Sequence, residues 1–235
     1  MSPRRQPEQQ APPVQKLALR YAKRGRARFA SHRDFGRAFE RALRRAEVPM
    51  AFSSGFHPHP RISYLNASPT GAATEAEYMV VGLATAVDPV WLRDTLNAAL
   101  PDGLEILAVV DAPSGLADRL KAAHWEVRLA GTDSSEVAAA VRELLAQPTH
   151  LVSRQTKAGL REFDVRPAIH QLEATGDGFE LISAIGEPLV RPEDVVMALQ
   201  QLRPALASSG PGLANRLEQG TWDGERVRPP FETIS

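Results

Sequence analysis

Apolar residues recur with helical spacing in four stretches of the chain. The clearest stretch follows Gly25, where residues spaced i, i+3, i+4, i+7, i+8 and i+11 are Phe35, Ala38, Phe39, Ala42, Leu43 and Ala46. Ser31 stands where it can cap this helix, and Asp34 follows three residues later as the acidic half of a capping box. Further helices are predicted over 88–100, 135–146 and 191–202.

Short alternating or continuous apolar runs predict strands between these helices. In the first half they cover 16–24, 48–52, 77–84 and 104–110, and in the second half 124–129, 150–155 and 179–185. Residues 53–74 are rich in Pro, Gly and Ser and predict a long irregular stretch. The order strand, helix, strand, strand, helix, strand is that of a ferredoxin-like split βαβ unit. The second half repeats this order loosely, without sequence identity to the first.

We therefore expect an α+β protein built from two split βαβ units, with antiparallel sheets and helices on one face. The predicted boundaries are a polar, proline-rich disordered tail at 1–13, a first unit at 14–112 and a second unit at 122–203, joined through 116–121. Residues 204–235 are rich in Gly, Pro and Ser and predict a loosely packed tail.

Composition excludes several classes of protein. The 235 residues include no cysteine, which excludes a disulfide scaffold, a thiolate zinc site, a cysteine nucleophile and an iron–sulfur cluster held by this chain. No run approaches the roughly 18 apolar residues of a membrane span, and the N-terminus lacks the apolar core of a signal peptide. We expect a cytoplasmic protein that does not engage a membrane and binds no cofactor.

The formal net charge of zero conceals an uneven distribution. Residues 1–61 hold 14 Lys and Arg against 4 Asp and Glu, whereas residues 62–235 hold 14 against 24. On the helix after Ser31, the arginines at 33, 37, 41 and 44 lie within about 80° of one another, with Arg45 just beyond, opposite the apolar stripe. Guanidinium groups in this arrangement suit phosphates. A solvated helix face remains the alternative, because 24 of the 28 basic residues are arginine.

The segment SSGFHPHPRIS at 53–63 carries the most unusual residues. Phe56 can stack on a base, His57 and His59 point the same way if the segment is extended, and Arg61 can contact a phosphate. A metal site formed by the two histidines would need Glu75 or Glu77 as a further ligand. The spacing matches no standard zinc site, so we expect no metal.

Two other groups of residues are candidates. Asp34 is either a helix cap or a carboxylate nucleophile or base in an arginine-rich pocket, as an RNA-modifying enzyme could use. In the second half, the charged residues Lys157, Asp164, Arg166 and Arg191 form a cluster, in which Asp164 and Arg166 are expected to be a structural ion pair.

These motifs together resemble a family of bacterial proteins of unknown function that are associated with radical S-adenosylmethionine (SAM) enzymes. The resemblance spans about residues 15–202. The matching residues are Lys23, Gly25, Ser31, His32, Asp34, Arg37, Arg44, Arg45, Pro49, Gly55, Phe56, Pro58, Pro60, Glu75, Glu77, Asp164, Val165, Arg166, Pro167, Arg191 and Pro192. Arg33 departs from the family pattern, which is usually apolar there.

The resemblance implies a protein encoded beside, or fused behind, a radical SAM enzyme, and in some actinobacteria a ribonuclease E/G gene neighbourhood. Because this chain cannot hold an iron–sulfur cluster, the radical enzyme is expected to be a separate chain. Our first hypothesis is a non-catalytic or substrate-presenting RNA-binding accessory protein for the radical enzyme. In this hypothesis the basic front, including Lys23, Arg37, Arg41, Arg44 and Arg45, contacts phosphates. The alternatives are an RNA base-modifying enzyme centred on Asp34 and a protein–protein adaptor. The sequence therefore does not decide whether the protein is an enzyme.

Overall fold

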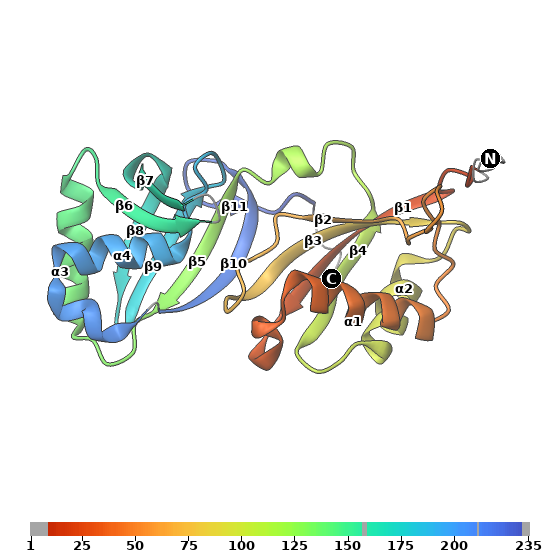
Figure 1. The fold of residues 1–235 in the computed structure, drawn as a ribbon, viewed down its shortest axis with the longest axis horizontal. Coiled ribbons are helices and arrows are strands. Elements are labelled where there is room, and N and C mark those ends of the chain that lie inside the picture. The colour runs from red at the N-terminus through yellow and green to blue at the C-terminus, as the bar shows by residue number, and fades with distance from the viewer. Residues whose placement is uncertain (1–8, 157–158, 211, 232–235) are drawn as a thin grey trace, which may run out of the picture. The chain divides into compact units, whose positions relative to one another are not determined.

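Four α-helices and eleven strands are found in the part of the chain that the structure, a computed structural model, describes: residues 9–156, 159–210 and 212–231 (Figure 1). The chain divides into two units. Of the described residues, unit 1 holds those within Met1–Thr70, Ala76–Ala117 and Phe231–Ser235, and unit 2 holds Gly71–Glu75 and those within Asp118–Pro230. The protein is a mixed α/β chain whose strand pairings are mostly antiparallel.

Unit 1 is a sheet covered by two helices on one face (Figure 1). Its strands run in the order β4-β1-β3-β2. The elements are β1 (Gln15–Lys23), the short 3-10 helix η1 (Gly25–Phe29), α1 (His32–Arg45), β2 (Ile62–Leu65), β3 (Ala73–Leu83), α2 (Pro89–Ala99) and β4 (Leu104–Asp111).

The core of unit 1 follows from two periodicities. Alternation in β1 puts Leu17 and Leu19 on the face that the helices cover, and the 3.6-residue stripe of α1 puts Phe35 and Phe39 against them. Phe39 is completely buried. The exposed residues of α1 therefore lie on the side of the helix that faces solvent.

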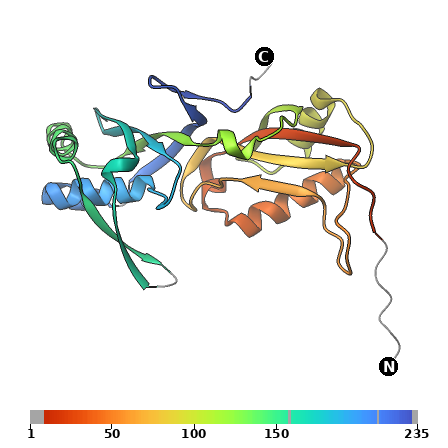
Figure 2. The same cartoon turned by 90° about the horizontal axis from the view of Figure 1, so that it is seen from above.

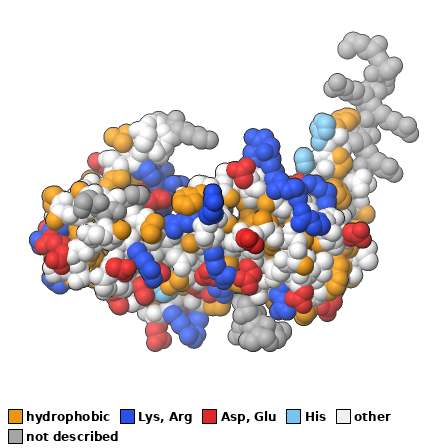
Figure 3. Space-filling view, turned by 90° about the horizontal axis from the view of Figure 1, so that it is seen from below, with side chains coloured by type: hydrophobic (Ala, Val, Ile, Leu, Met, Phe, Trp, Pro, Cys, Tyr) orange, Lys and Arg blue, Asp and Glu red, His pale blue; other side chains and the backbone are white. Residues whose placement is uncertain are grey.

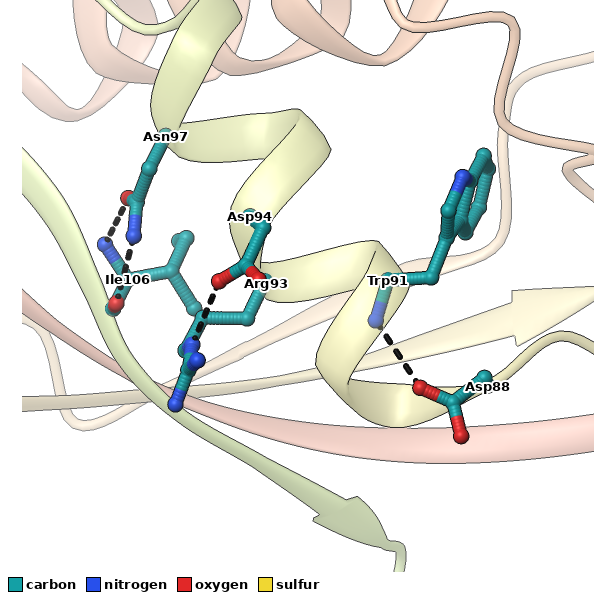
Figure 4. Close-up of polar contacts among 6 residues, drawn as sticks. All are labelled: Asp88, Trp91, Arg93, Asp94, Asn97 and Ile106. Carbon is teal, nitrogen blue, oxygen red and sulfur yellow. Dashed lines mark hydrogen bonds and ion pairs between the residues drawn. The ribbon is translucent and has the colours of Figure 1, made fainter. Parts of the chain in front are cut away.

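Polar side chains fix the position of α2 (Figure 4). The carboxylate of Asp88 accepts a hydrogen bond from the Trp91 amide at 2.9 Å, which caps the helix. The Asn97 side chain accepts from the Ile106 amide at 2.7 Å and donates to its carbonyl at 3.0 Å. This pair of bonds joins the last turns of α2 to β4.

Unit 2 combines further strands of the nine-stranded sheet, which its helices cover, with a separate two-stranded sheet, β6–β7, which projects from them (Figure 2). The main strands run in the order β10-β5-β9-β8, all antiparallel, and the start of β3 pairs parallel with β10. The elements are the 3-10 helix η2 (Ala117–Arg119), β5 (Ala122–Arg128), α3 (Ser134–Ala146), β6 (Leu151–Thr156), β7 (Gly159–Asp164), η3 (Arg166–Ala168), β8 (Ile169–Thr175), β9 (Gly178–Ala184), α4 (Pro192–Leu202), η4 (Pro204–Ser209), β10 (Leu213–Trp222) and β11 (Val227–Arg228).

The four predicted helices are confirmed within a residue or two, but several strand predictions need correction. The strand expected at 48–52 is reduced to two isolated bridges, Met50–Leu83 and Phe52–Pro60, whereas β2 lies inside the stretch expected to be irregular. The strand expected at 150–155 belongs to the β6–β7 pair rather than to the main sheet, where β8 takes its place.

The largest difference concerns the segment expected to be a C-terminal tail. Residues 213–222 form β10, which pairs with β5 from Leu213–Arg128 to Gly220–Ala122. Helix η4 also falls in this segment. Within the described residues, the helices include none that is both long and apolar enough to span a membrane.

Candidate nucleic-acid interface

Helix α1 carries a row of exposed arginines, which we call the arginine face: Arg33, Arg37, Arg41, Arg44 and Arg45. The last two have partners, because Arg44 lies 4.0 Å from the Glu40 carboxylate and Arg45 donates to the Ala99 carbonyl at 3.2 Å. Among the described residues, the other three guanidinium groups have no ion pair or side-chain hydrogen bond. Figure 3 shows Lys and Arg side chains gathered on one face of the molecule, with histidines beside them.

The loop predicted to bind a base is held by its own hydrogen bonds. The Ser53 amide donates to the His59 carbonyl at 2.9 Å, and the His59 amide donates to the Ser53 hydroxyl at 3.1 Å. Gly55 has a φ of +130°, which only glycine adopts without strain. Phe56, which is 66% exposed, and the exposed His57 therefore lie on a loop with a closed base.

A pocket of about 260 Å³ joins the loop to α1. Glu40, Leu43 and Arg44 line it from the helix, and Met50, Phe52 and His59 line it from the segment that follows. The structure thus brings Arg44 and His59, two residues that the sequence pattern indicated, to one concave site. Glu40 and Phe52 belong to this site although the sequence pattern did not indicate them.

Two predicted contacts lie elsewhere. Lys23 is only 6% exposed, so its side chain is not part of the arginine face. The Arg61 Nε donates to the Phe52 carbonyl at 3.0 Å, and the residue lines a different pocket of about 340 Å³ together with Lys16. Arg61 therefore closes the base of the loop.

Aromatic rings pack where α1 begins. The Tyr64 ring contacts His32 at 4.8 Å and Phe35 at 5.7 Å between ring centroids, and Phe35 stacks on Tyr21 at 4.7 Å. Burial, with a smaller contribution from the Glu40 carboxylate, raises the pKa of Tyr64 to about 12. Tyr64 is therefore a neutral hydroxyl over the physiological range.

Asp34 takes part in capping α1. Its amide donates to the Ser31 hydroxyl at 3.2 Å, and that hydroxyl lies 2.7 Å from the Asp34 carboxylate. The carboxylate thus contacts the hydroxyl of Ser31 rather than its amide, the partner in a capping box. Asp34 is exposed and sits at the N-terminal end of the arginine face.

An aromatic residue that the sequence pattern did not mark as a candidate lies just before α1. Phe29 ends η1 and is 66% exposed, and the Arg28 guanidinium lies 5.4 Å from its ring centroid. The available signal was an aromatic residue inside a basic turn, GRARF, directly before a helix cap. Exposed aromatic rings thus lie on the segments before and after α1.

Comparison with known families places most of the chain in one of them. Residues 16–197 match a family described as uncharacterized protein conserved in bacteria (DUF2344). The chain belongs to this family. None of the curated proteins matches the chain. The part that matches DUF2344 includes all of α1 and the loop after it, whereas β10 lies beyond it.

The charged cluster of unit 2 also lies within the DUF2344 match, and the structure assigns it structural contacts. The expected Asp164–Arg166 ion pair is not formed in the described residues. Instead, the Asp164 carboxylate accepts from the amides of Arg166 and His150 at 2.9 and 2.8 Å. The Arg166 guanidinium donates to the Gln147 carbonyl at 3.0 Å, at the C-terminal end of α3. Lys157 lies outside the described residues.

Arg191, the remaining member of that cluster, begins α4. Its amide donates to the Asp194 carboxylate at 2.7 Å, and Arg154 donates to the same carboxylate at 2.6 Å. Asp194 is 1% exposed, so the carboxylate of the Arg154–Asp194 ion pair is buried. These contacts tie the start of α4 to β6, which is a structural role.

Proposed function

We propose that this protein binds RNA, or another phosphate-bearing substrate, through the arginine face and the loop beside it, and that it serves a radical SAM enzyme as a non-catalytic accessory protein. The observation that carries the proposal is the row of exposed arginines on α1, next to a pocket that contains both Arg44 and His59. We propose that it acts in the cytoplasm, where bacterial RNA is made and modified.

Electrostatics favour an anion at this face. Like charges at i and i+4, such as Arg33, Arg37 and Arg41, destabilise an isolated helix by about 0.2–0.5 kcal/mol per pair. A bound phosphate removes this cost and accepts two parallel hydrogen bonds from a guanidinium group. Exposed Phe29 and Phe56 add surfaces on which unpaired bases can stack.

Paired arginine variants test this proposal. We expect the double variant Arg37→Ala/Arg41→Ala to weaken filter binding of transfer RNA and ribosomal RNA at least tenfold. Its melting temperature should not fall, because both side chains are exposed and their removal relieves the like-charge repulsion on the helix. Arg142→Ala, an exposed arginine on α3, is the matched control and should bind as the wild type does. Equal binding by all three proteins would remove the arginine face from the interface.

The radical enzyme is proposed as a partner on the basis of the motif resemblance together with the absence of cysteine from the chain. The resemblance implies that a radical SAM enzyme is encoded beside this protein, and we expect the two to co-purify. Mass spectrometry of modified nucleosides from a strain that lacks this protein should show the loss of one modification. An unchanged nucleoside profile would contradict the RNA-directed role.

We also propose that each unit is a ferredoxin-like split βαβ unit. The order β4-β1-β3-β2 in unit 1 and the order β10-β5-β9-β8 in unit 2 support it, because each unit has its first strand beside its last and its third. In unit 2 the β6–β7 pair is then an insertion between α3 and the second strand, β8.

A further inference from the structure

We infer that the pocket between α1 and the following loop binds one unpaired nucleobase, and that Glu40 makes guanine the preferred base. This inference rests on the proposed RNA binding and names the substrate class of the same site. It assigns a role in specificity to a residue that neither the sequence pattern nor the family match indicates.

The walls of the pocket suit a flat apolar ring. Leu43 and Met50 are buried, at 2% and 8% exposed, and form the inner wall. Phe52, which is 43% exposed, offers an aromatic surface at the side of the loop. At about 260 Å³ the pocket is small for a drug-sized ligand, for which sites of about 300–1,000 Å³ are usual, but a single base is smaller.

Three polar side chains line the pocket: Glu40, Arg44 and His59. Glu40 is a hydrogen-bond acceptor, whereas Arg44 and His59 suit a phosphate or the edge of a base. An ionised carboxylate accepts hydrogen bonds and donates none, so Glu40 can pair only with N–H or O–H groups. Arg44 donates only, and its side chain is 69% exposed, which leaves it accessible to the backbone of a bound strand. His59 lies on the loop side of the same pocket.

Among the four bases, guanine complements a carboxylate best. Its Watson–Crick edge presents two adjacent donors, N1–H and the N2 amino group, which match the two oxygens of Glu40. Uracil presents one donor between two acceptors, and adenine and cytosine each place an acceptor beside their amino group. The two carboxylate oxygens would repel that acceptor, so guanine gains a hydrogen bond where the other bases lose one.

The carboxylate oxygens of Glu40 are available to accept hydrogen bonds from a bound guanine. Its distance of 4.0 Å from the Arg44 guanidinium is longer than a hydrogen bond, and its side chain is 38% exposed. Arg44 therefore lies beside Glu40 without occupying its oxygens. A base entering the pocket meets a charged acceptor at one edge.

Fluorescence anisotropy with short labelled RNA strands tests this inference. The probes are four single-stranded pentanucleotides that differ only in the central base, placed in an otherwise uniform uridine or adenosine context. We expect the wild-type protein to bind the strand with central guanine about 5- to 150-fold more tightly than the other three, the range of one bidentate contact to a base. Glu40→Gln should abolish most of this preference, because an amide has one acceptor in place of two.

Two controls keep the outcomes distinct. Glu47→Gln removes the same charge just after α1, outside the pocket, and should retain the preference. Phe52→Ala removes an exposed wall of the pocket and should weaken the binding of all four RNA strands. Equal binding of the four strands by the wild type, with affinity still reduced in Arg37→Ala/Arg41→Ala, would overturn this inference and leave RNA binding intact. Failure of all four strands and of folded RNA to bind would overturn both.

Discussion

The side chain of Tyr64 packs against the start of α1 and lies near Glu40 of the candidate site. Its ring packs against His32 and Phe35, and its hydroxyl lies 3.6 Å from where a Cβ on Gly36 would stand. An alanine at position 36 would therefore place its Cβ in ordinary van der Waals contact with this hydroxyl. Burial raises the pKa of Tyr64 to about 12, with the nearby Glu40 carboxylate adding to the shift.

This raised pKa makes a prediction about alkaline stability. Because the pKa is higher in the folded chain than the ordinary value of 10.0, the contribution of Tyr64 to stability is fully present below pH 10 and is lost as the pH rises toward 12. We expect the wild type to lose up to roughly 2 kcal/mol more than Tyr64→Phe across this interval. Urea unfolding at several pH values measures the difference, and identical pH profiles for the two proteins would contradict it.

At the scale of elements, α1 was predictable and the pocket beside it was not. The apolar stripe of α1 and its Ser31 cap are local signals, and they also fix which arginines point outward. The pocket depends on the chain folding back after α1, held by the long-range bridge between Met50 and Leu83. No spacing within the loop encodes that contact, so Glu40 gave no sequence signal as a site residue.

Strand β10 escaped prediction for a different physical reason. Its buried positions hold Arg216 and Gln219, at 3% and 0% exposed, so the apolar alternation that marks a half-buried strand is broken. Arg216 lies over the Trp125 ring at 5.3 Å, which gives a buried cation an aromatic neighbour. Strand β2 was missed because its four residues lie in a stretch rich in turn formers.

Because Asp34 takes part in capping α1, we expect substitutions at this cap to change the stability of the helix rather than the affinity for RNA. Ser31→Ala should destabilise the protein by about 1 kcal/mol, because the Asp34 amide loses its acceptor at the helix start. Asp34→Asn should cost less and leave RNA affinity and any associated activity unchanged. Thermal melting and filter binding measure the two effects. Loss of activity in Asp34→Asn without a change in melting would instead favour the catalytic alternative.

The position of β10 predicts that unit 2 cannot form without it. A chain that ends at Gly210 lacks the partner that β5 uses from Ala122 to Arg128, and it exposes that edge of the sheet. We expect this truncation to lose the cooperative unfolding transition of unit 2 and to aggregate. A chain that ends at Phe231 retains every described strand and is the control. If the shorter chain keeps the unfolding transition that the control shows for unit 2, measured by circular dichroism, β10 is dispensable.

At the scale of the whole molecule, zero net charge does not argue against a polyanionic partner. The excess of 10 positive charges in residues 1–61 includes the arginine face, and an equal negative excess follows in the remaining residues. Over distances beyond about 10 Å, charges are screened at physiological salt, so a bound strand responds to the local face rather than to the total. The distribution of charge, more than its sum, thus favours RNA binding.

The salt dependence of RNA binding tests this account most directly. We expect the logarithm of the wild-type binding constant to fall linearly with the logarithm of salt concentration. In Arg37→Ala/Arg41→Ala the slope should be smaller by about 0.7–0.9 for each phosphate that the variant no longer neutralises. Arg142→Ala should keep the wild-type slope. Binding that does not depend on salt, or the same slope in all three proteins, would contradict the claim that the arginine face binds phosphates.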